Sequence, residues 1–285
     1  MTEHIQSPGG FLGGYKLLNI LGKGLSGEVW AALGKDKTVV ALKIFASGTS
    51  LEAVESEFRT GAQMNHRNIL SPLSFFSSEG VNVIVMPLCN GRSVDNAAGY
   101  YSEQATWKLI LDISSAIAYL HSGNFCHADI KPSNILRRDK DFFLADFGSC
   151  FEMGTNTSAG DVSSYIYSAP EKNRTSESDI WSLGASVFFL VTGTQVFGGL
   201  GGKAQKRDSV IPFLRRSMPE LSEFVIRCLA FEPSDRPTAV EAISLAESNL
   251  CRLSETKAIR PKRNGVLPGR NEYEDFWPET MSEAK

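Results

Sequence analysis

Apolar and polar positions separate the chain into a strand-rich first part and a helix-rich second part. Four short runs of apolar and β-branched residues predict strands, at 15–21, 28–32, 39–45 and 81–86. Apolar residues recur at helical spacing over 51–64 and 103–122, which predicts two helices. Residues 1–14 are polar and glycine-rich, so we expect a flexible N-terminus there.

Composition restricts the class of protein. The 285 residues exceed the usual size of one compact domain, so one large domain or two closely packed domains would fit. Apolar residues make up 42% and charged residues 21%, an ordinary mixture for a chain that buries a large core. The formal net charge of −3 argues against a nucleic-acid partner bound through bulk positive charge.

Neither the cysteines nor the apolar runs predict a secreted or membrane protein. The five cysteines are scattered, odd in number and without CxxC spacing, which favours reduced thiols over disulfides or a zinc site. The N-terminus lacks a basic region followed by an apolar run, so no signal peptide is predicted. The longest apolar run, 181–191, is interrupted and too short to span a membrane. We therefore expect a cytoplasmic protein with no membrane span.

A glycine-rich turn lies between the first two predicted strands. It contains Gly22, Gly24 and Gly27, and glycines let backbone N–H groups approach phosphate oxygens without a Cβ in the way. Glycine-rich hairpins are common, so the turn alone is a weak indication of nucleotide binding. It precedes a strand rather than a helix, which argues against a dinucleotide-binding turn.

The segment from His127 to Asn134 gathers the side chains that phosphoryl transfer needs. It reads His-Ala-Asp-Ile-Lys-Pro-Ser-Asn and supplies an acid, a cation and a carboxamide in one loop. A second acid follows in Asp146-Phe147-Gly148. Phosphoryl transfer needs an acid to orient the acceptor hydroxyl, oxygen ligands for Mg²⁺ and positive charge on the transferred phosphate.

These segments resemble the catalytic and metal-binding loops of eukaryotic-type protein kinases, usually HRDLKxxN followed by DFG. The resemblance runs from about Gly22 to Arg236. It includes Ala169-Pro170-Glu171, the helix start at 179–184, and Arg236, which is expected to pair with Glu171. Kinases of small molecules generally lack these last three features. Seven motifs in the right order make the resemblance specific.

The resemblance implies an α+β, bilobal fold. A kinase domain over residues 15–250 would have a β-rich N-lobe over 15–88 and a larger α-helical C-lobe over 89–250, with ATP and Mg²⁺ between the lobes. Residues 251–285 turn polar, and we expect a tail there that is disordered or docked on the domain. Phe276 and Trp277 favour docking, so a regulatory partner of this tail is one possibility.

The resemblance also implies roles for the polar residues of the two loops. Asp129 would accept or orient the proton of the acceptor hydroxyl, and Lys131 would neutralise charge on the transferred phosphate. Asn134 and Asp146 would hold Mg²⁺ through oxygen atoms, which this ion prefers. Lys131 resembles serine/threonine kinases more than tyrosine kinases, so Ser and Thr hydroxyls of a protein substrate are the expected acceptors. His127 is expected to pack and hydrogen-bond.

A lysine–glutamate pair is expected at the nucleotide. Lys43 would pair with the α- and β-phosphates, and Glu57 would hold the lysine, whereas Glu52 and Glu55 are expected on the solvated helix face. Pro87 and Cys89 would offer main-chain groups to adenine, although Cys89 could equally be an incidental small apolar residue. The full expected nucleotide site comprises Gly22, Gly24, Gly27, Val29, Ala41, Lys43, Pro87, Cys89 and Leu136.

Two positions depart from the family pattern. Ala128 replaces the arginine that usually pairs with a phosphate on the activation segment, so we expect activity that does not need that phosphate. Gly61 replaces a bulky apolar residue one turn after Glu57, which predicts a packing gap and a more mobile helix. In the activation segment, expected over 149–167, the candidate modification sites are Thr155, Thr157, Ser158 and Ser163, and Ser164 stands where the family usually has a threonine.

Two other functions remain open on the sequence alone. The departures at Ala128 and Gly61 allow a pseudokinase that binds ATP or acts as a scaffold. The intact set of Lys43, Glu57 and the two loops argues against this function. An enzyme that phosphorylates a small-molecule hydroxyl is a third possibility, which the Ala-Pro-Glu segment disfavours.

Overall fold

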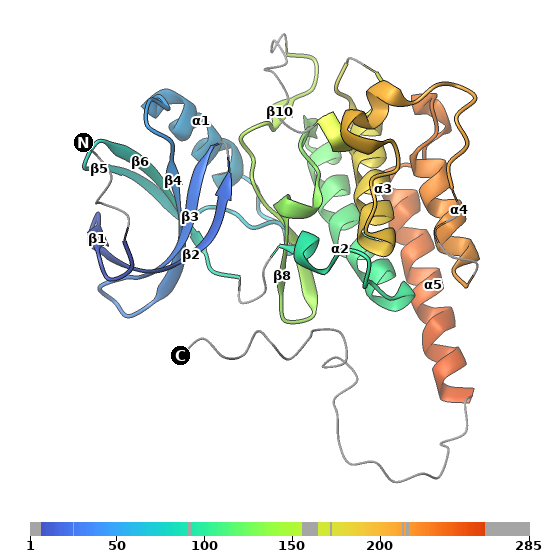
Figure 1. The fold of residues 1–285 in the computed structure, drawn as a ribbon, viewed down its shortest axis with the longest axis horizontal. Helices are drawn as coiled ribbons and strands as arrows, with labels where there is room; N and C mark the ends of the chain where they lie inside the picture. Colours follow the sequence, from blue (N-terminus) through green and yellow to red (C-terminus); the bar gives the residue numbers. More distant parts are fainter. Residues whose placement is uncertain are drawn as a thin grey trace.

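The computed structural model describes residues 7–24, 26–89, 93–155, 165–171, 173–212, 214 and 217–259. These residues form a strand-rich lobe followed by a helical lobe (Figure 1). The expected α+β, two-lobed arrangement is therefore confirmed.

One antiparallel sheet forms the N-lobe. Its strand order is β1-β2-β3-β4-β6-β5. The strands are β1 (Phe11–Leu12), β2 (Tyr15–Gly24), β3 (Gly27–Leu33), β4 (Val39–Phe45), β5 (Ser74–Ser78) and β6 (Val81–Pro87). A single helix, α1 (Leu51–Ala62), lies beside this sheet and begins at Ser50, whose side chain accepts from the Ala53 N–H. Together they carry Lys43 and Glu57 on neighbouring elements.

The N-terminal stretch that the sequence predicts to be flexible contains the short strand β1. Phe11–Leu12 pair with β2, and the Leu12 side chain is fully buried in the apolar cluster of the sheet. Gly13 turns the chain at a φ of 56°, where an added Cβ would lie 2.2 Å from the Phe76 ring. The burial of Leu12 gives this short strand the apolar contact that the neighbouring glycines and the exposed Phe11 do not supply.

Four helices form the frame of the C-lobe: α2 (Glu103–Ser122), α3 (Ser176–Thr192), α4 (Pro219–Cys228) and α5 (Ala239–Ile259). Two small antiparallel sheets accompany them, β7 (Phe125–Cys126) with β10 (Phe151–Glu152) and the hairpin of β8 (Ile135–Arg138) with β9 (Asp141–Leu144). Short 3₁₀ turns complete the lobe: η1 (Val94–Ala97), η2 (Pro132–Asn134), η3 (Tyr165–Tyr167), η4 (Gly198–Ala204) and η5 (Pro233–Asp235).

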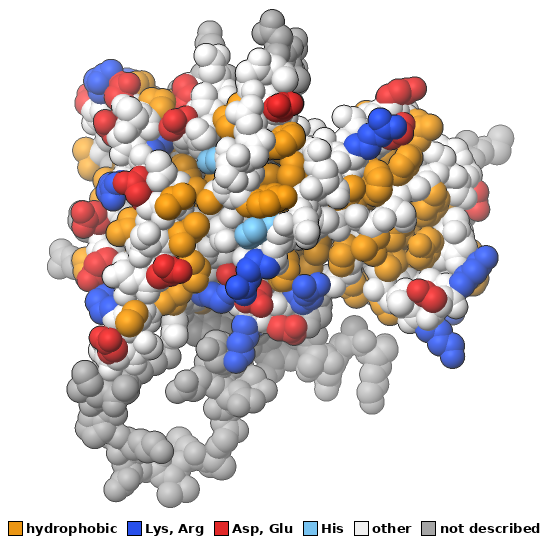
Figure 2. Space-filling view, turned by 180° about the vertical axis from the view of Figure 1, so that it is seen from behind, with side chains coloured by type: hydrophobic (Ala, Val, Ile, Leu, Met, Phe, Trp, Pro, Cys, Tyr) orange, Lys and Arg blue, Asp and Glu red, His pale blue; other side chains and the backbone are white. Residues whose placement is uncertain are grey.

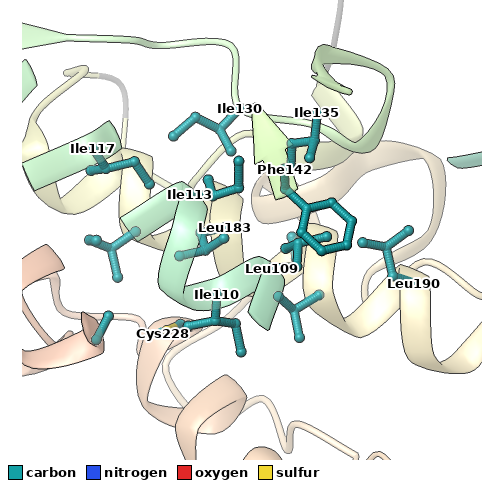
Figure 3. Close-up of a cluster of buried hydrophobic side chains, with 14 of the residues drawn as sticks. Leu109, Ile110, Ile113, Ile117, Ile130, Ile135, Phe142, Leu183, Leu190 and Cys228 are labelled. Carbon is teal, nitrogen blue, oxygen red and sulfur yellow. The ribbon is translucent and has the colours of Figure 1, made fainter. Parts of the chain in front are cut away.

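The core of the C-lobe lies between α2, α3 and the β8–β9 hairpin (Figure 3). Apolar side chains at helical spacing on α2 face Leu183 and Leu190 of α3. Ile130, within the proposed catalytic loop, and Ile135, directly after it, are buried in the same cluster. The loop is thereby fixed to the core at two points.

Helix α5 continues to Ile259, so the chain is helical beyond the expected start of a tail at residue 251. Arg252 Nη2 lies 3.0 Å from Glu103 Oε1 and 3.5 Å from Glu220 Oε2, which ties this part of the helix to α2 and α4. Phe276 and Trp277 lie outside the described residues. Within the described part of the chain, each helix is too short or too polar to cross a membrane.

Acidic and basic side chains are interspersed on the face shown in Figure 2. This mixture agrees with the small formal net charge of −3. The expectation of no nucleic-acid partner remains a prediction.

Candidate active site

Lys43 lies at the centre of an ion-pair network between the lobes. Its Nζ lies 2.7 Å from Glu57 Oε1 and 2.9 Å from Asp146 Oδ1. Strand β4 presents the lysine toward α1, and only 7% of Lys43 is exposed. Burial alone would lower the pKa of Lys43, but the two carboxylates outweigh burial and raise its pKa. The lysine is therefore a fixed cation.

The two acids of this network differ in how readily they hold a negative charge. Burial, together with the charge of Asp146, raises the pKa of Glu57 despite the neighbouring lysine. Burial opposes ionisation of Asp146 as well, but Lys43 and the Gly148 N–H outweigh it and lower the pKa of Asp146. Asp146 is thus the stronger acid of the pair and the better oxygen ligand for a cation.

The Asp146-Phe147-Gly148 segment is held closely against α1. Asp146 has a φ of 70°, an uncommon value for a residue with a side chain. Phe147 is buried and packs edge-on against His127, with ring centroids 5.3 Å apart. A Cβ at Gly148 would lie 2.8 Å from Glu57 Oε2, so glycine allows this approach without a shift of the Glu57 carboxylate.

The catalytic loop brings its acid, cation and carboxamide together. Asp129 Oδ2 lies 2.7 Å from Lys131 Nζ. Asn134 Nδ2 donates to the backbone oxygen of Asp129 at 2.9 Å and to its Oδ2 at 3.0 Å. The Ala145 N–H donates to the Asn134 carbonyl at 2.9 Å, which joins this loop to the segment that carries Asp146.

Asp179, from α3, fixes the start of the loop. Its carboxylate accepts from the backbone N–H groups of His127 and Ala128, both at 2.9 Å, and lies 3.0 Å from His121 Nε2. Burial would raise the pKa of Asp179, but these donors outweigh it and lower the pKa. Ala128 has a φ of 62°, and the two hydrogen bonds hold it in this costly conformation.

His127 packs inside the C-lobe. It is fully buried, and burial lowers the pKa of its imidazole, so the ring is neutral. The Asp129 N–H donates to its Nδ1 at 3.3 Å. This is the packing and hydrogen-bonding role that the sequence predicts.

The three glycines of the N-lobe turn are accommodated for different structural reasons. A Cβ at Gly22 or Gly24 would meet nothing within 4 Å, so both positions have open space beside them. Gly27 has a φ of 138°, and its Cβ would lie 2.0 Å from the Ile44 carbonyl oxygen. The sheet itself requires Gly27, whereas Gly22 and Gly24 leave room for a ligand.

Residues of the expected adenine pocket come from both lobes. Ala41 is buried and pairs with Met86 across the sheet, while Pro87 ends β6. Cys89 and Leu136 pack against one apolar cluster that joins the lobes. Burial raises the pKa of Cys89, so its thiol is protonated.

The expected gap beside Gly61 is absent, and this part of the sequence interpretation is wrong. Gly61 is buried, and an added Cβ would lie 2.8 Å from Pro72 Cδ and 3.2 Å from Phe147 Cδ2. The Pro72 ring, which follows α1 in the chain, fills the space. Sequence reasoning missed Pro72 because it lies in a loop without periodicity.

The predicted Arg236–Glu171 pair is confirmed. Arg236 Nη1 and Nη2 lie 2.6 and 2.8 Å from the two Glu171 oxygens, a bidentate arrangement. The guanidinium also donates to the carbonyls of Glu177 and Ala230, both at 3.0 Å. Arg236 therefore links the Ala-Pro-Glu segment to α3 and to the turn before α5.

Of the candidate modification sites, Thr155 is described. It is exposed, and its hydroxyl donates to the Glu152 carbonyl at 2.6 Å. The remaining candidates, Thr157, Ser158 and Ser163, lie outside the described residues, as does Ser164.

The comparison with known families agrees with this geometry. A model of the protein kinase domain matches residues 15–246. The chain therefore belongs to the protein kinase family. Members of this family generally use ATP and Mg²⁺ and act on protein substrates.

Relatives across several organisms are protein kinases. The chain is 30% identical over 251 residues to a probable serine/threonine-protein kinase of Dictyostelium discoideum, covering 81% of this chain and 51% of that protein. It is 29% identical over 248 residues to the serine/threonine-protein kinase ppk11 of Schizosaccharomyces pombe, covering 79% and 78%. A probable cell division protein kinase of Encephalitozoon cuniculi is 29% identical over 262 residues, covering 82% and 97%. The chain spans about half the length of the Dictyostelium protein and of mkk2 of Aspergillus fumigatus.

Proposed function

We propose that this chain is an active protein serine/threonine kinase, which transfers the γ-phosphoryl group of ATP to Ser or Thr hydroxyls. The observation that carries the proposal is the Lys43 network with Glu57 and Asp146, 2.7 and 2.9 Å from the lysine. The names of the relatives and the lysine at position 131 support the Ser/Thr class.

The charged and polar groups that meet between the two lobes suit ATP with Mg²⁺. When bound, ATP would supply the phosphoryl group and Mg²⁺ would neutralise its charge. Asp146 and Asn134 offer the hard oxygen atoms that Mg²⁺ prefers, and Lys43 offers a cation for phosphate oxygens. The open space beside Gly22 and Gly24 would let backbone N–H groups approach the phosphates.

Three residues would handle the acceptor. Asp129 would orient the substrate hydroxyl and receive its proton at a carboxylate oxygen. Lys131 Nζ, 2.7 Å from Asp129 Oδ2, is close enough to neutralise charge on the transferred group. Asn134 keeps the Asp129 carboxylate in one orientation through its amide. Positioning and charge stabilisation would then supply most of the catalysis.

We further propose that activity does not require a phosphate on the activation segment. Ala128 has no charged group to pair with such a phosphate. The conformation of the catalytic loop instead depends on hydrogen bonds from its backbone to the carboxylate of Asp179, both 2.9 Å long. A partner that binds residues 251–285 could supply regulation in place of the phosphate.

A pseudokinase is the second candidate, and the departure at Ala128 favours it. The presence of Asp129, Asn134 and Asp146 argues against it, because inactive members of this family usually have a substitution at one of these positions. A small-molecule kinase is disfavoured by the buried Arg236–Glu171 pair, which belongs to a segment that those enzymes generally lack.

The test is phosphoryl transfer from labelled ATP by the purified chain with Mg²⁺, beside an Asp129→Asn variant. Incorporation on Ser or Thr that the variant abolishes would support the proposal. ATP-dependent thermal stabilisation without transfer would favour the pseudokinase. Transfer that is lost when Thr155, Thr157, Ser158 and Ser163 are replaced by alanine, with Ser164 retained, would refute independence from phosphorylation.

A further inference from the structure

The Glu28 carboxylate links the two strands of the glycine-rich turn. Its Oε1 lies 2.7 Å from Lys23 Nζ, and its Oε2 accepts a hydrogen bond from the indole Nε1 of Trp30 at 2.9 Å. Lys23 on β2 lies directly opposite Glu28 on β3. The hydrogen bonds from Lys23 and Trp30 lower the pKa of Glu28, so its carboxylate is charged near neutral pH.

Trp30 fixes one end of this arrangement in the core of the N-lobe. The residue is 4% exposed and belongs to the apolar cluster that contains Leu17 and Leu42. A buried indole N–H needs an acceptor, and Glu28, two positions away on the same face of β3, supplies one. The core thus orients the carboxylate, and the carboxylate in turn holds Lys23.

These side chains lie on the face of the sheet opposite to the expected nucleotide. Val29 pairs directly with Lys43 of β4, so these two side chains share the face that would meet the phosphates. Successive side chains of a strand point to opposite faces, so Glu28 and Trp30 point away from that face. They can therefore hold the turn from behind without occupying the open space beside its glycines.

The ion pair lies at the part of the turn where the backbone has the most freedom. Lys23 lies between Gly22 and Gly24 in the chain, and Gly24 and Gly27 form the next pair of the hairpin. Glycine allows many backbone conformations, so holding N–H groups toward phosphate oxygens requires a contact from elsewhere. The pair between Lys23 and Glu28 supplies such a contact one position from the glycines.

We propose that Glu28 is a positioning residue for the nucleotide, which holds the glycine-rich turn through Lys23 and Trp30 so that its backbone N–H groups face the phosphates of ATP. This proposal rests on the proposed function for its effect on ATP. The pair with Lys23 is exposed to solvent, since 69% of the lysine side chain is accessible. Its effect should therefore be moderate and should weaken as the salt concentration rises.

The test compares Glu28→Gln, Lys23→Met and their double variant with the wild type. Glutamine can still accept from Trp30 but loses the charge pair, so we expect the Kd for ATP with Mg²⁺ and the KM for ATP to rise about three- to fivefold. At saturating ATP, kcat should stay within about twofold of the wild-type value, because the residues proposed to act on the transferred phosphoryl group are unchanged. The double variant should bind ATP no more weakly than Glu28→Gln alone.

Two further variants separate the contact from general effects of charge and packing. Trp30→Phe keeps an aromatic ring in the core but removes the indole N–H, and we expect it to raise the Kd about twofold. Lys16→Met removes an equal charge from an exposed position of the same strand, away from the turn, and should leave the Kd and the KM unchanged. Additive losses for Lys23→Met and Glu28→Gln, or an unchanged Kd for Glu28→Gln, would overturn the proposal.

Failure of the proposed function would be distinguishable from failure of this proposal, because the Kd can be measured without turnover. A wild-type protein that binds ATP without phosphoryl transfer would refute the kinase activity, and the Kd values would still decide the role of Glu28. A wild-type protein that binds no ATP would refute both. Normal phosphoryl transfer with the same Kd for the wild type and Glu28→Gln would refute the role of Glu28 alone.

Discussion

The Asn134 side chain holds the Asp129 carboxylate in place. Its Nδ2 donates at 2.9 Å to the backbone oxygen of Asp129 and at 3.0 Å to Oδ2 of the same residue. Asn134 is buried, so the amide has few other orientations. One residue therefore has two proposed tasks, the orientation of the acid and the binding of Mg²⁺.

These two tasks of Asn134 can be separated by substitution. Asn134→Ala removes both, and we expect kcat to fall by about 100-fold or more because Asp129 loses its orientation. Asn134→Asp keeps an oxygen for Mg²⁺ but cannot donate to Asp129, so it should be impaired to a similar degree. The measurement is kcat at increasing Mg²⁺, with Ser133→Ala as an exposed neighbouring control. Near-normal activity of Asn134→Asp at high Mg²⁺ would show that the hydrogen bonds are unimportant.

The glycines of the N-lobe turn provide a second prediction. Gly27→Ala should reduce the free energy of unfolding by about 2–4 kcal/mol, because φ is 138° and the new Cβ would overlap the Ile44 carbonyl. Gly22→Ala meets no atom within 4 Å, so its stability should change by about 0.5 kcal/mol or less. Its KM for ATP should rise, since the methyl group would obstruct the phosphates.

Urea unfolding and ATP titration of both variants provide the measurement. Equal losses of stability would contradict the structural distinction between the two glycines. An unchanged KM for Gly22→Ala would contradict the assignment of Gly22 to the phosphates.

The Arg236–Glu171 pair leads to a third prediction. Arg236 is 6% exposed and donates to two carboxylate oxygens and to neighbouring carbonyls. Lysine cannot reproduce this planar set of donors, so Arg236→Lys should cost about 3 kcal/mol of stability. Arg207→Lys, at an exposed ion pair with Glu232, is the matched control and should cost less than about 0.5 kcal/mol. Similar thermal midpoints for the two variants would argue against the buried pair.

Sequence reasoning found the polar residues of the site because each is part of a recognisable motif. Lys43 and Asp146 are 103 positions apart, so no local pattern relates them. Their assignment to one site followed from the order of motifs and from the resemblance to protein kinases, whereas the direct ion pair between them was not predicted. The Arg236–Glu171 pair, 65 positions apart, was found in the same way.

The features that sequence reasoning missed depend on contacts between parts of the chain that have no motif. Leu12 joins the sheet because its side chain reaches an apolar cluster, although its neighbours are glycine-rich. Pro72 fills the space beside Gly61, and only the packed structure reveals this. The end of α5 has a polar sequence that resembles a tail, and Arg252 attaches it to Glu103, 149 positions earlier.

The buried histidine His127 predicts how stability depends on pH. Burial lowers its pKa, so the folded state keeps the ring neutral while the unfolded chain binds a proton near pH 6.5. Because the unfolded state then binds more protons, this contribution to stability is present above about pH 6.5 and is lost as pH falls below it. Burial lowers the pKa of His66 too, which adds a loss of the same sign.

Between pH 7.5 and 5.5 we expect His127 to reduce the free energy of unfolding by about 1 kcal/mol. The carboxylates with lowered pKa values, Asp146 and Asp179, act at lower pH and contribute little in this range. Urea unfolding at several pH values would measure the slope, with His127→Asn as the comparison. The variant should be less stable than the wild type at pH 7.5 but should lose less stability on acidification. Parallel pH profiles for the two proteins would mean that His127 titrates alike in the folded and unfolded states.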